Sequence, residues 1–394
     1  MAKVEKIVSQ KKTTEKNSDG EKGLMSLFGE DALFLDGDIG SVGSYDVIRT
    51  GSPSLDYALG IGGIPRGRII QLAGKESSGK TLISLLCMKT WLNEHPENTV
   101  MFIDAEFTYD PRWARDLGVD TSRVVVVKTN DAKKIFEGLV GRMKVNQITK
   151  KATKDTKGVL DLVIEGEDPR FKRLGLIVLD SVAAMQTPME ADAIVGKQNM
   201  APMSRFLTTE LKKLTPALAE ANVAMIFINQ IRENPGDPSG QMMTSGGHAL
   251  KHACSVMINV NPMGGADNIV LDDNDQKIGH KAKAKVAKNK VGPPYRESIY
   301  TIKYTEGLIE RETELLELAV LCGVIERPST VSYLINGEKI VGKEKASVFL
   351  KNKAAFSEVE EACRTIYLAG AVAGSFTPSE DEEQEENDLI SEIE

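Results

Sequence analysis

The chain has 394 residues, 41% of them hydrophobic and 27% charged, which is the composition of an ordinary globular protein. This length suggests two or three domains and is large enough to bury a core without disulfides or a structural metal. The four cysteines are widely spaced, which excludes the close pairs of a zinc site and fits a reducing cytosol. Because we find no signal-peptide core and no membrane-length apolar run, we expect a cytoplasmic protein.

The formal net charge of −8 argues at first against a nucleic-acid-binding protein, whose surface is usually basic. The acidic excess, however, lies in residues 380–394, which hold nine acids and no base. Without that segment, 49 basic residues face 48 acidic ones. The body of the chain is therefore nearly neutral, and its charge excludes no class of partner.

In chain order, residues 1–23 are polar and lysine-rich and predict a flexible basic arm. Residues 24–50 are expected to form an N-terminal oligomerisation element. It starts inside the apolar patch GLMSLFG (23–29), which indicates a helical turn or a docking element. From 51 to 310 apolar strands alternate with helical stretches, which predicts an α/β core with a mostly parallel central sheet. The strand candidates have little polar alternation, as expected of strands covered on both faces, and span 68–74, 99–106, 174–181 and 222–230.

Helical periodicity marks two further elements, the stripes Leu207, Leu211, Leu214, Leu218 and Leu315, Leu318, Ala319, Cys322. Between the strands, the charge-rich and helix-poor residues at about 150–173 predict a surface insertion. After residue 310 the pattern changes, which predicts a small α/β C-terminal domain over 311–375. A disordered acidic tail is expected at 376–394.

The strongest motif is GKESSGKT at 74–81, which matches G-x-x-x-x-G-K-[ST] in full. An apolar strand precedes it and an apolar helical run follows it, as a phosphate-binding loop requires. Glycines let successive backbone N–H groups point at phosphates, and the helix N-terminus adds positive potential. We expect Lys80 to reach the β- and γ-phosphates and Thr81 to ligate Mg²⁺. The rest of the expected nucleotide loop is Gly74, Glu76, Ser77, Ser78 and Gly79.

Acidic residues at the ends of two predicted strands are candidates for metal and water chemistry. Asp180 ends LIVLD, where its carboxylate would emerge beside the phosphate loop and support the metal. Asp104 and Glu106 end FIDAE, and Glu106 is a candidate base for attack of water on the γ-phosphate. Each acid taken alone is equally consistent with a helix N-cap or a solvated turn.

Together these segments resemble the bacterial RecA recombinases. GSPSLDYALGIGGIPRGRIIQLAGKESSGKT, FIDAEFTYDPRWARDLGVD, LIVLDSVAAM, IFINQIR, SGGHALK and KVAKNK stand in that family's order, over roughly residues 24–375. The resemblance implies an ATP- and Mg²⁺-dependent DNA recombinase, bacterial or phage-encoded, with a RecA-type P-loop ATPase core. Such a protein forms a helical filament on single-stranded DNA and exchanges strands with homologous duplex DNA in repair.

The resemblance also assigns roles to single residues. Gln230 would sense the γ-phosphate and couple it to the DNA loop that follows, and Asp110 and Trp113 would contact adenine. Lys288 and Lys290 would act as catalytic groups that reach the γ-phosphate of the neighbouring subunit. The alternatives are a core tryptophan and, for the alternating lysines at 281–285, the solvated face of an edge strand.

Two loops, 187–204 and 231–247, are implied to bind DNA without reading its sequence. Met200 would wedge between bases, Arg205 and Arg232 would contact phosphates, and amides around Gly246 and Gly247 would cradle the strand. Gly, Pro, Asn and Asp fill the second loop, which predicts disorder until DNA binds. Long loops of this kind can also be active-site lids.

Two positions depart from the family pattern. His248 stands where asparagine usually follows the double glycine, and His252 replaces an interface aromatic linked to cooperativity. The coupling between ATP and DNA could therefore differ and depend on pH, because imidazole titrates near neutrality. The expected partners are DNA, further copies of the chain and a single-strand-binding protein. The acidic tail would compete with DNA for basic surfaces or only solvate the chain. A ring helicase on the same core and a non-hydrolytic mediator that loads another recombinase remain alternatives.

Overall fold

The computed structural model describes residues 45–145, 152–191, 202–233, 242–335 and 337–370. The predicted basic arm, the patch at 23–29, Met200 and the acidic tail lie outside the described residues. The elements described below belong to the unit that begins at Asp46. None of the helices described is both long enough and apolar enough to cross a membrane.

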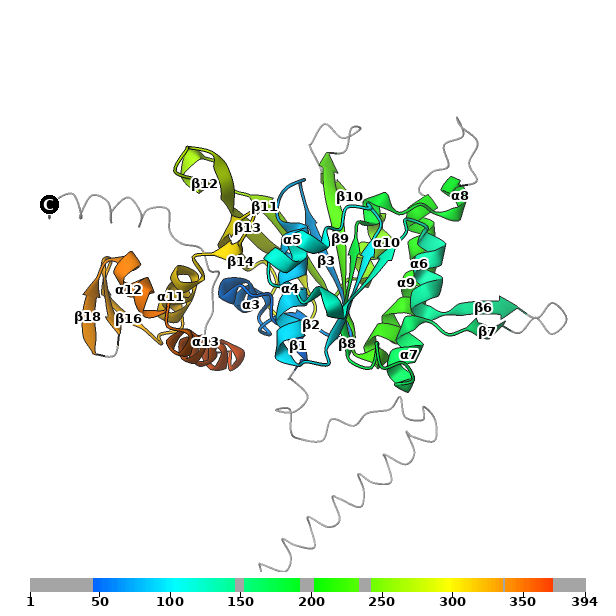
Figure 1. Ribbon diagram of the computed structural model, residues 1–394, viewed down its shortest axis with the longest axis horizontal. Coiled ribbons are helices and arrows are strands. Elements are labelled where there is room, and N and C mark those ends of the chain that lie inside the picture. Colours follow the sequence, from blue (N-terminus) through cyan, green and yellow to red (C-terminus); the bar gives the residue numbers. More distant parts are fainter. Residues whose placement is uncertain (1–44, 146–151, 192–201, 234–241, 336, 371–394) are drawn as a thin grey trace, which may run out of the picture. The chain divides into compact units, whose positions relative to one another are not determined.

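An 11-stranded sheet forms the centre of this unit (Figure 1). Its main path runs β15-β14-β13-β11-β3-β9-β8-β4-β5, with β10 paired to β9 and β12 paired to β13. From β11 to β5 the neighbouring strands are parallel, whereas β13, β14 and β15 join antiparallel. This confirms the predicted α/β class with a mostly parallel sheet. The strands are β3 (Ile69–Gly74), β4 (Thr99–Asp104), β5 (Val124–Lys128), β8 (Leu174–Asp180), β9 (Ala224–Glu233), β10 (Met242–Thr244), β11 (Val256–Pro262), β12 (Ile269–Leu271), β13 (Lys277–Asn289), β14 (Glu297–Lys303) and β15 (Gly307–Ile309).

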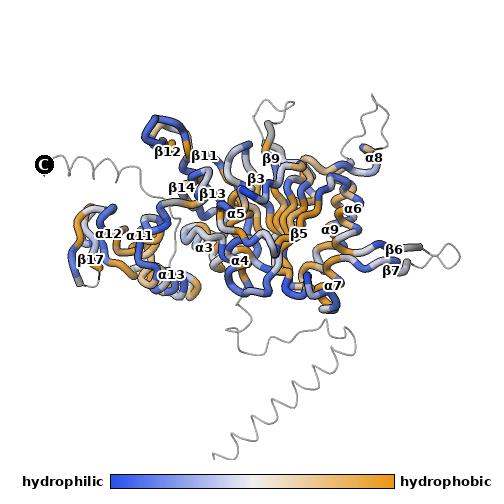
Figure 2. The backbone as a smooth tube through the Cα atoms, in the orientation of Figure 1, coloured by the Kyte–Doolittle hydropathy of each residue, from blue (hydrophilic) through white to orange (hydrophobic). Residues whose placement is uncertain are grey.

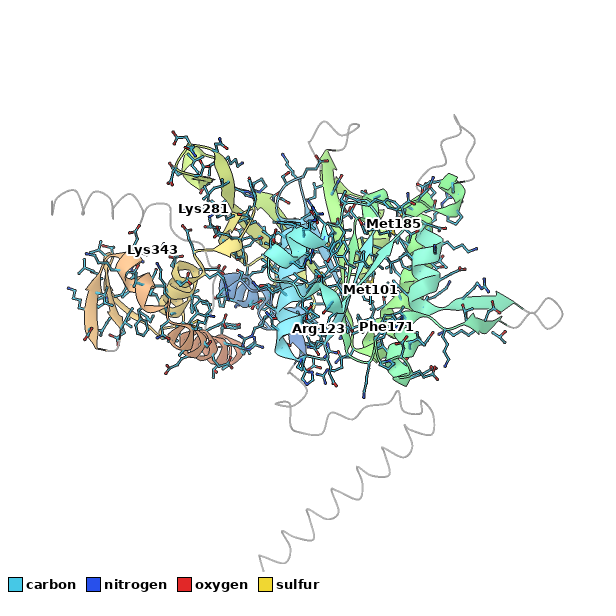
Figure 3. The ribbon with its side chains drawn as sticks, in the orientation of Figure 1. Met101, Arg123, Phe171, Met185, Lys281 and Lys343 are labelled. Atoms are coloured by element: carbon cyan, nitrogen blue, oxygen red, sulfur yellow. The ribbon has the colours of Figure 1, made fainter. Side chains whose placement is uncertain are left out.

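Helices cover both faces of the sheet because successive strand residues point to opposite sides. Phe102 belongs to the core under α4, whereas its neighbours Met101 and Ile103 belong to the core under α6, α7 and α9. The predicted leucine stripe on α9 is fully or almost fully buried. Figure 2 shows the resulting apolar centre, and in Figure 3 Met101, Phe171 and Met185, all at most 9% exposed, lie in the second core. The helices of this part are α3 (Pro53–Leu59), α4 (Lys80–Glu94), α5 (Pro111–Asp116), α6 (Ala132–Val140), α7 (Val159–Glu165), α8 (Pro188–Ala191), α9 (Pro202–Ala221) and α10 (Gly247–Ala253), with short 3₁₀ turns at Thr121–Arg123, Val182–Ala184 and Ala266–Asn268.

Two predictions of irregular structure are wrong in part. Within the segment taken as helix-poor, α7 forms between Gly158 and Gly166, and its Leu160 is fully buried against the second core. A hairpin of β6 (Arg142–Val145) and β7 (Ala152–Thr156) precedes this helix. In the second loop that was predicted to bind DNA, β9 continues to Glu233 and pairs with β10, and α10 begins at Gly247. Part of that loop is therefore regular structure.

The C-terminal segment has a small sheet and a core of its own. Its elements are α11 (Arg311–Leu321), β16 (Glu326–Ser329), β17 (Ser332–Ile335), β18 (Glu338–Val341), α12 (Lys343–Phe349) and α13 (Lys353–Leu368). The predicted stripe on α11 is buried there, together with Tyr333 and Cys363. Tyr57 from α3 joins this cluster, so the segment packs on the first helix of the α/β core.

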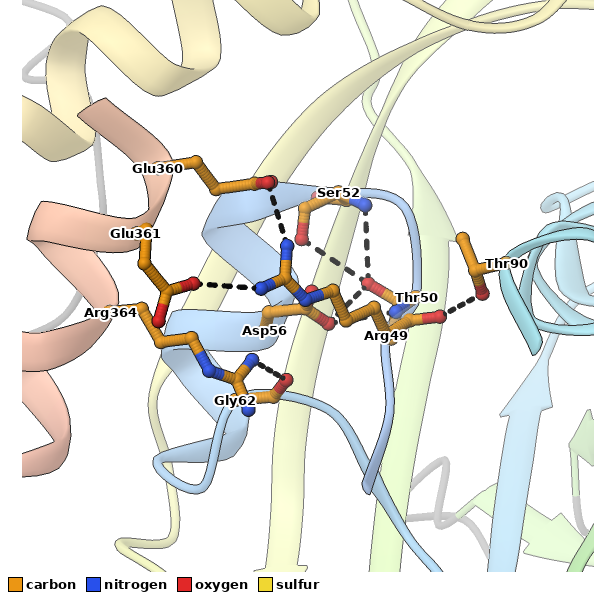
Figure 4. A network of polar contacts seen from close by, with 9 residues as sticks. All are labelled: Arg49, Thr50, Ser52, Asp56, Gly62, Thr90, Glu360, Glu361 and Arg364. Atoms are coloured by element: carbon orange, nitrogen blue, oxygen red, sulfur yellow. Dashed lines mark hydrogen bonds and ion pairs between the residues drawn. The ribbon is translucent and has the colours of Figure 1, made fainter. Parts of the chain in front are cut away.

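Polar contacts complete the packing of α13 on the core (Figure 4). Arg49 follows β1 (Val47–Ile48), which pairs with β2 (Ile64–Pro65), and its guanidinium donates to Glu360 at 2.8 Å and Glu361 at 3.0 Å. Arg364 donates to the carbonyl of Gly62 at 2.9 Å, and Thr90 of α4 donates to the carbonyl of Arg49. The chain segment before α3 thus contacts both the phosphate-loop helix and the last helix.

Two carboxyl groups are buried beside these contacts. Asp56 accepts hydrogen bonds from the Thr50 amide at 2.9 Å and its hydroxyl at 2.8 Å, both at Oδ1. Glu314 accepts from the Ser52 hydroxyl at 2.5 Å and the Ser54 amide at 2.6 Å, both at Oε1. Burial raises the pKa of each carboxyl to about 7, although these hydrogen bonds oppose the shift.

The raised pKa values make stability depend on pH. An unfolded chain releases these protons near pH 4, whereas the folded chain holds them until about pH 7, so protonation favours the fold. We expect the free energy of unfolding to fall by a few kcal/mol as pH rises from about 4 to about 7. Asp56→Asn and Glu314→Gln retain the accepting oxygens and should together flatten this slope, measured from thermal unfolding midpoints. A slope that persists in the double variant would contradict the assignment.

Candidate nucleotide-binding site

The phosphate loop joins the end of β3 to the start of α4 and leaves no room for side chains at its glycines. A Cβ on Gly74 would lie 2.0 Å from the carbonyl oxygen of Val260. Gly79 has φ +92°, and a Cβ there would meet the Ile302 side chain at 2.5 Å. Gly79 is also the N-cap of α4 and supplies no side-chain cap, so the first amides of the helix can bind an anion. Between the glycines, Glu76 and Ser77 are exposed and Ser78 is fully buried.

Lys80 is folded into this loop. Its ammonium donates to the carbonyl of Lys75 at 2.5 Å and to the hydroxyl of Ser78 at 3.3 Å, and the side chain is 7% exposed. Burial lowers the pKa of Lys80, while the carboxylates of Asp180, Glu106 and Glu76 raise it. A buried ammonium bound only to neutral oxygens can gain charged partners if phosphates enter the loop.

Thr81 and Asp180 are brought together as predicted. The Thr81 hydroxyl donates to Asp180 Oδ2 at 2.8 Å, across the gap between α4 and the end of β8. Asp180 is 6% exposed, and burial raises its pKa to about 6, with Glu106 and Asp104 adding to the rise. A hydroxyl and a carboxylate are the hard oxygen ligands that Mg²⁺ prefers. In the described part of the chain, no three His, Cys, Asp or Glu side chains gather as a metal site.

Glu106 and Asp180 stand at the ends of neighbouring strands, because Asp104 of β4 is in register with Asp180 of β8. The Ser181 hydroxyl donates to Glu106 Oε1, a contact that the sequence did not reveal. Asp104 has a different position from Glu106. It is fully buried and accepts from the amides of Thr108 at 3.0 Å and Tyr109 at 3.1 Å, so it shapes the turn after β4.

The two residues expected to contact adenine have local structural partners. Asp110 is the N-cap of α5 and accepts from the Arg112 amide at 2.7 Å. The indole of Trp113 donates to the carbonyl of Tyr304 at 3.0 Å, and its ring packs partly buried against the first core. Contact with a nucleotide base remains a prediction for both.

Gln230 lies beside the phosphate loop, because β3 and β9 pair Gly74 with Gln230. The preceding residue, Asn229, is fully buried and donates to the carbonyl of Ser245 at 2.7 Å. Sequence analysis missed Asn229, although an amide inside the apolar run IFINQ was the available signal. This hydrogen bond connects the edge of the sheet that carries the phosphate loop to Ser245, the residue before Gly246.

Lys288 and Lys290 hold the C-terminal end of α10 within the same chain. The ammonium of Lys288 donates to the carbonyls of Lys251 at 2.5 Å and His252 at 3.4 Å, and that of Lys290 donates to His252 at 3.2 Å. Cations at the C-terminal end of a helix also favour its dipole. Burial and the charge of Lys290 lower the pKa of Lys288.

The residues expected to bind DNA are distributed around α9 and α10. Arg205 is exposed in the first turn of α9, and Arg232 is opposite Met243 in the β9–β10 pair. Gly246 and Gly247 have φ +85° and +57° and pack on α9. A Cβ on Gly246 would meet Leu207 at 2.8 Å, so close helix packing also explains this glycine. DNA binding by all four remains a prediction.

A parallel sheet that carries a glycine loop, a buried lysine and a threonine–aspartate pair at its edge defines a P-loop nucleotide-binding protein. The model of the RecA N-terminal domain matches residues 21–150 and 155–309. Protein RecA of Helicobacter hepaticus is 36% identical over 343 residues, 86% of this chain and 89% of that protein. Protein RecA of Rhodospirillum centenum is 33% identical over 350 residues, 88% of each chain. The chain therefore belongs to the RecA family of ATP-dependent recombinases.

Among solved structures, the chain is similar to the crystal structure of the RadB recombinase. Its TM-score is 0.46 at 18% sequence identity, over 66% of this chain and 98% of that one.

Proposed function

We propose that the protein is a DNA-dependent ATPase that assembles as a helical filament on single-stranded DNA and exchanges strands with homologous duplex DNA. The observation that carries the proposal is the Thr81–Asp180 pair beside the buried Lys80, in a chain that matches RecA proteins over most of its length. ATP and Mg²⁺ are the cofactors that this pair and loop fit. A cytoplasmic location remains an expectation.

In this mechanism the phosphate loop binds the phosphates, and a carboxylate after the end of β4 activates water. The Lys80 ammonium leaves the carbonyl of Lys75 for phosphate oxygens, which gives it charge-assisted hydrogen bonds. Thr81 and Asp180 would hold Mg²⁺, which would supply positive charge to offset the charge of the phosphates. Glu106 accepts the proton of the attacking water while the Ser181 hydroxyl keeps its carboxylate in place.

Coupling to DNA runs along β9. Gln230 at the nucleotide edge senses the γ-phosphate, and Asn229 connects that edge to Ser245, just before the glycines that would cradle DNA. On assembly, Lys288 and Lys290 would exchange carbonyls of α10 for the phosphates of the neighbouring subunit's nucleotide. This exchange would make turnover depend on the filament.

DNA would be held through its backbone rather than through its sequence. Arg205 and Arg232 would contact phosphates, which gives affinity without sequence preference. Pairing between the bound strand and the duplex supplies the specificity instead. The acidic residues near the C-terminus would compete with DNA for these cations, unless they only solvate the chain.

The test is strand exchange between circular single-stranded DNA and homologous linear duplex DNA, with ATP and Mg²⁺. We expect joint molecules with the full chain and none with Lys80→Ala, because removing the ammonium leaves the phosphates without their main charged donor. Gel electrophoresis of the DNA measures the product. Binding and ATP hydrolysis without joint molecules would contradict the proposal, and closed rings on DNA in electron micrographs would favour a helicase.

A further inference from the structure

Two imidazoles lie on one exposed face of α10. His248 and His252 are four residues apart, a spacing that stacks side chains one turn apart on a helix. Their ring centroids are 6.2 Å apart and their planes differ by 30°. Both side chains are exposed, whereas Leu250 between them is 1% exposed and belongs to the second core. Burial of Leu250 therefore holds α10 against the core, while both imidazole rings remain accessible to solvent.

We propose that His248 and His252 form a binding site for a transition-metal dication of the Ni²⁺, Cu²⁺ and Zn²⁺ class, with water completing the coordination. Imidazole nitrogen suits these ions, and helical zinc sites use the same spacing of two histidines. A metal–nitrogen distance of about 2.0–2.1 Å requires one nitrogen of each ring to converge on a point. Rotation of two exposed side chains on one face provides this convergence. Mg²⁺ prefers oxygen ligands, so this site differs in chemistry from the Thr81–Asp180 pair.

The other histidines of the chain form no comparable pair. The chain has four histidines, and His95 and His280 have no histidine three or four residues away. His95 Nδ1 accepts from the Glu97 amide at 3.2 Å, and His280 is 3% exposed. His95, which lies at the end of α4, therefore serves as the matched control.

Lysine ammonium groups lie at the backbone of His252 and link the pair to the proposed nucleotide contact. The carbonyl of His252 accepts from Lys288 at 3.4 Å and from Lys290 at 3.2 Å, and Lys251 adjoins it in the helix. Repulsion from these ammonium groups lowers the affinity for a dication, and by reciprocity a bound dication disfavours charge on them. Because the proposed function assigns both lysines to the neighbouring nucleotide, an ion at this pair would change the electrostatic field at that contact.

Titration of the full, untagged chain with Ni²⁺ by calorimetry, without nucleotide or DNA and in excess Mg²⁺, tests the site. At about pH 7.5 we expect one saturable equivalent of Ni²⁺ for each chain. His248→Gln and His252→Gln should each lower the affinity about tenfold or more, whereas His95→Gln should leave it unchanged. Absence of binding, or binding that survives both substitutions in α10, would overturn the proposal.

A charge variant tests the link to the lysines. Lys288→Gln removes one positive charge near the ion and should tighten Ni²⁺ binding severalfold. Unchanged affinity in this variant would overturn that link. The titration requires neither ATP turnover nor DNA, so it can succeed if strand exchange fails and can fail if strand exchange succeeds.

Discussion

Glu106→Gln is expected to lower ATP turnover by about a hundred- to ten-thousandfold, the usual contribution of a general base. The amide keeps the oxygen that accepts from Ser181, so the side chain retains its position but loses its basicity. Binding of ATP and filament formation should persist, because Lys80, Thr81 and Asp180 are untouched. Steady-state hydrolysis on single-stranded DNA, with nucleotide binding measured in parallel, separates the two effects.

Asp116→Asn is the control for this substitution. It also replaces a carboxylate after β4 by an amide, at the exposed last residue of α5, which has no predicted role at the site. We expect it to leave turnover within a fewfold of the unaltered chain. Full turnover in Glu106→Gln would contradict the role of Glu106 as the base. If the variant lost turnover but kept the biological function of the protein, the non-hydrolytic mediator would be favoured instead.

Most of the fold could be predicted from short local patterns in the sequence. The four central strands are continuous apolar runs, and the phosphate loop has a fixed spacing of glycine, lysine and threonine, so short windows of sequence suffice. The acids at strand ends follow from the same logic. Because β4 and β8 are parallel neighbours, their carboxyl ends meet at one edge of the sheet and bring Glu106 near Asp180.

Long-range pairing explains what the sequence did not show. β9 continues past Gln230 only because β10, on the far side of residues 234–241, pairs with it. Helix α7 was hidden because charged residues flank its apolar VLDLVIE, and burial of Leu160 depends on packing against α6 and α9. The contacts between Arg49 and α13 join residues more than 300 positions apart, which no local pattern can reveal.

The second large expected effect concerns Lys288 and Lys290, at and just after the end of β13. Lys288→Ala combined with Lys290→Ala is expected to lower DNA-dependent turnover about a thousandfold or more, as removal of an arginine finger does in other nucleotide hydrolases. Loss of their contacts with the α10 carbonyls should cost only about 1 kcal/mol for each hydrogen bond. A large loss of turnover with a small change in thermal midpoint therefore indicates catalysis rather than capping.

Mixing two inactive variants tests whether these lysines act on the neighbouring subunit. A chain with Lys80→Ala lacks a working phosphate loop but keeps both lysines, whereas the Lys288→Ala, Lys290→Ala chain has the opposite defect. In a mixed filament, some interfaces combine an intact loop from one subunit with intact lysines from the next. Turnover should then reappear and should peak at intermediate mixing ratios, since only mixed interfaces are complete. If the mixture were as inactive as its parts, the lysines would act within their own chain, and their contacts with α10 would be their main role.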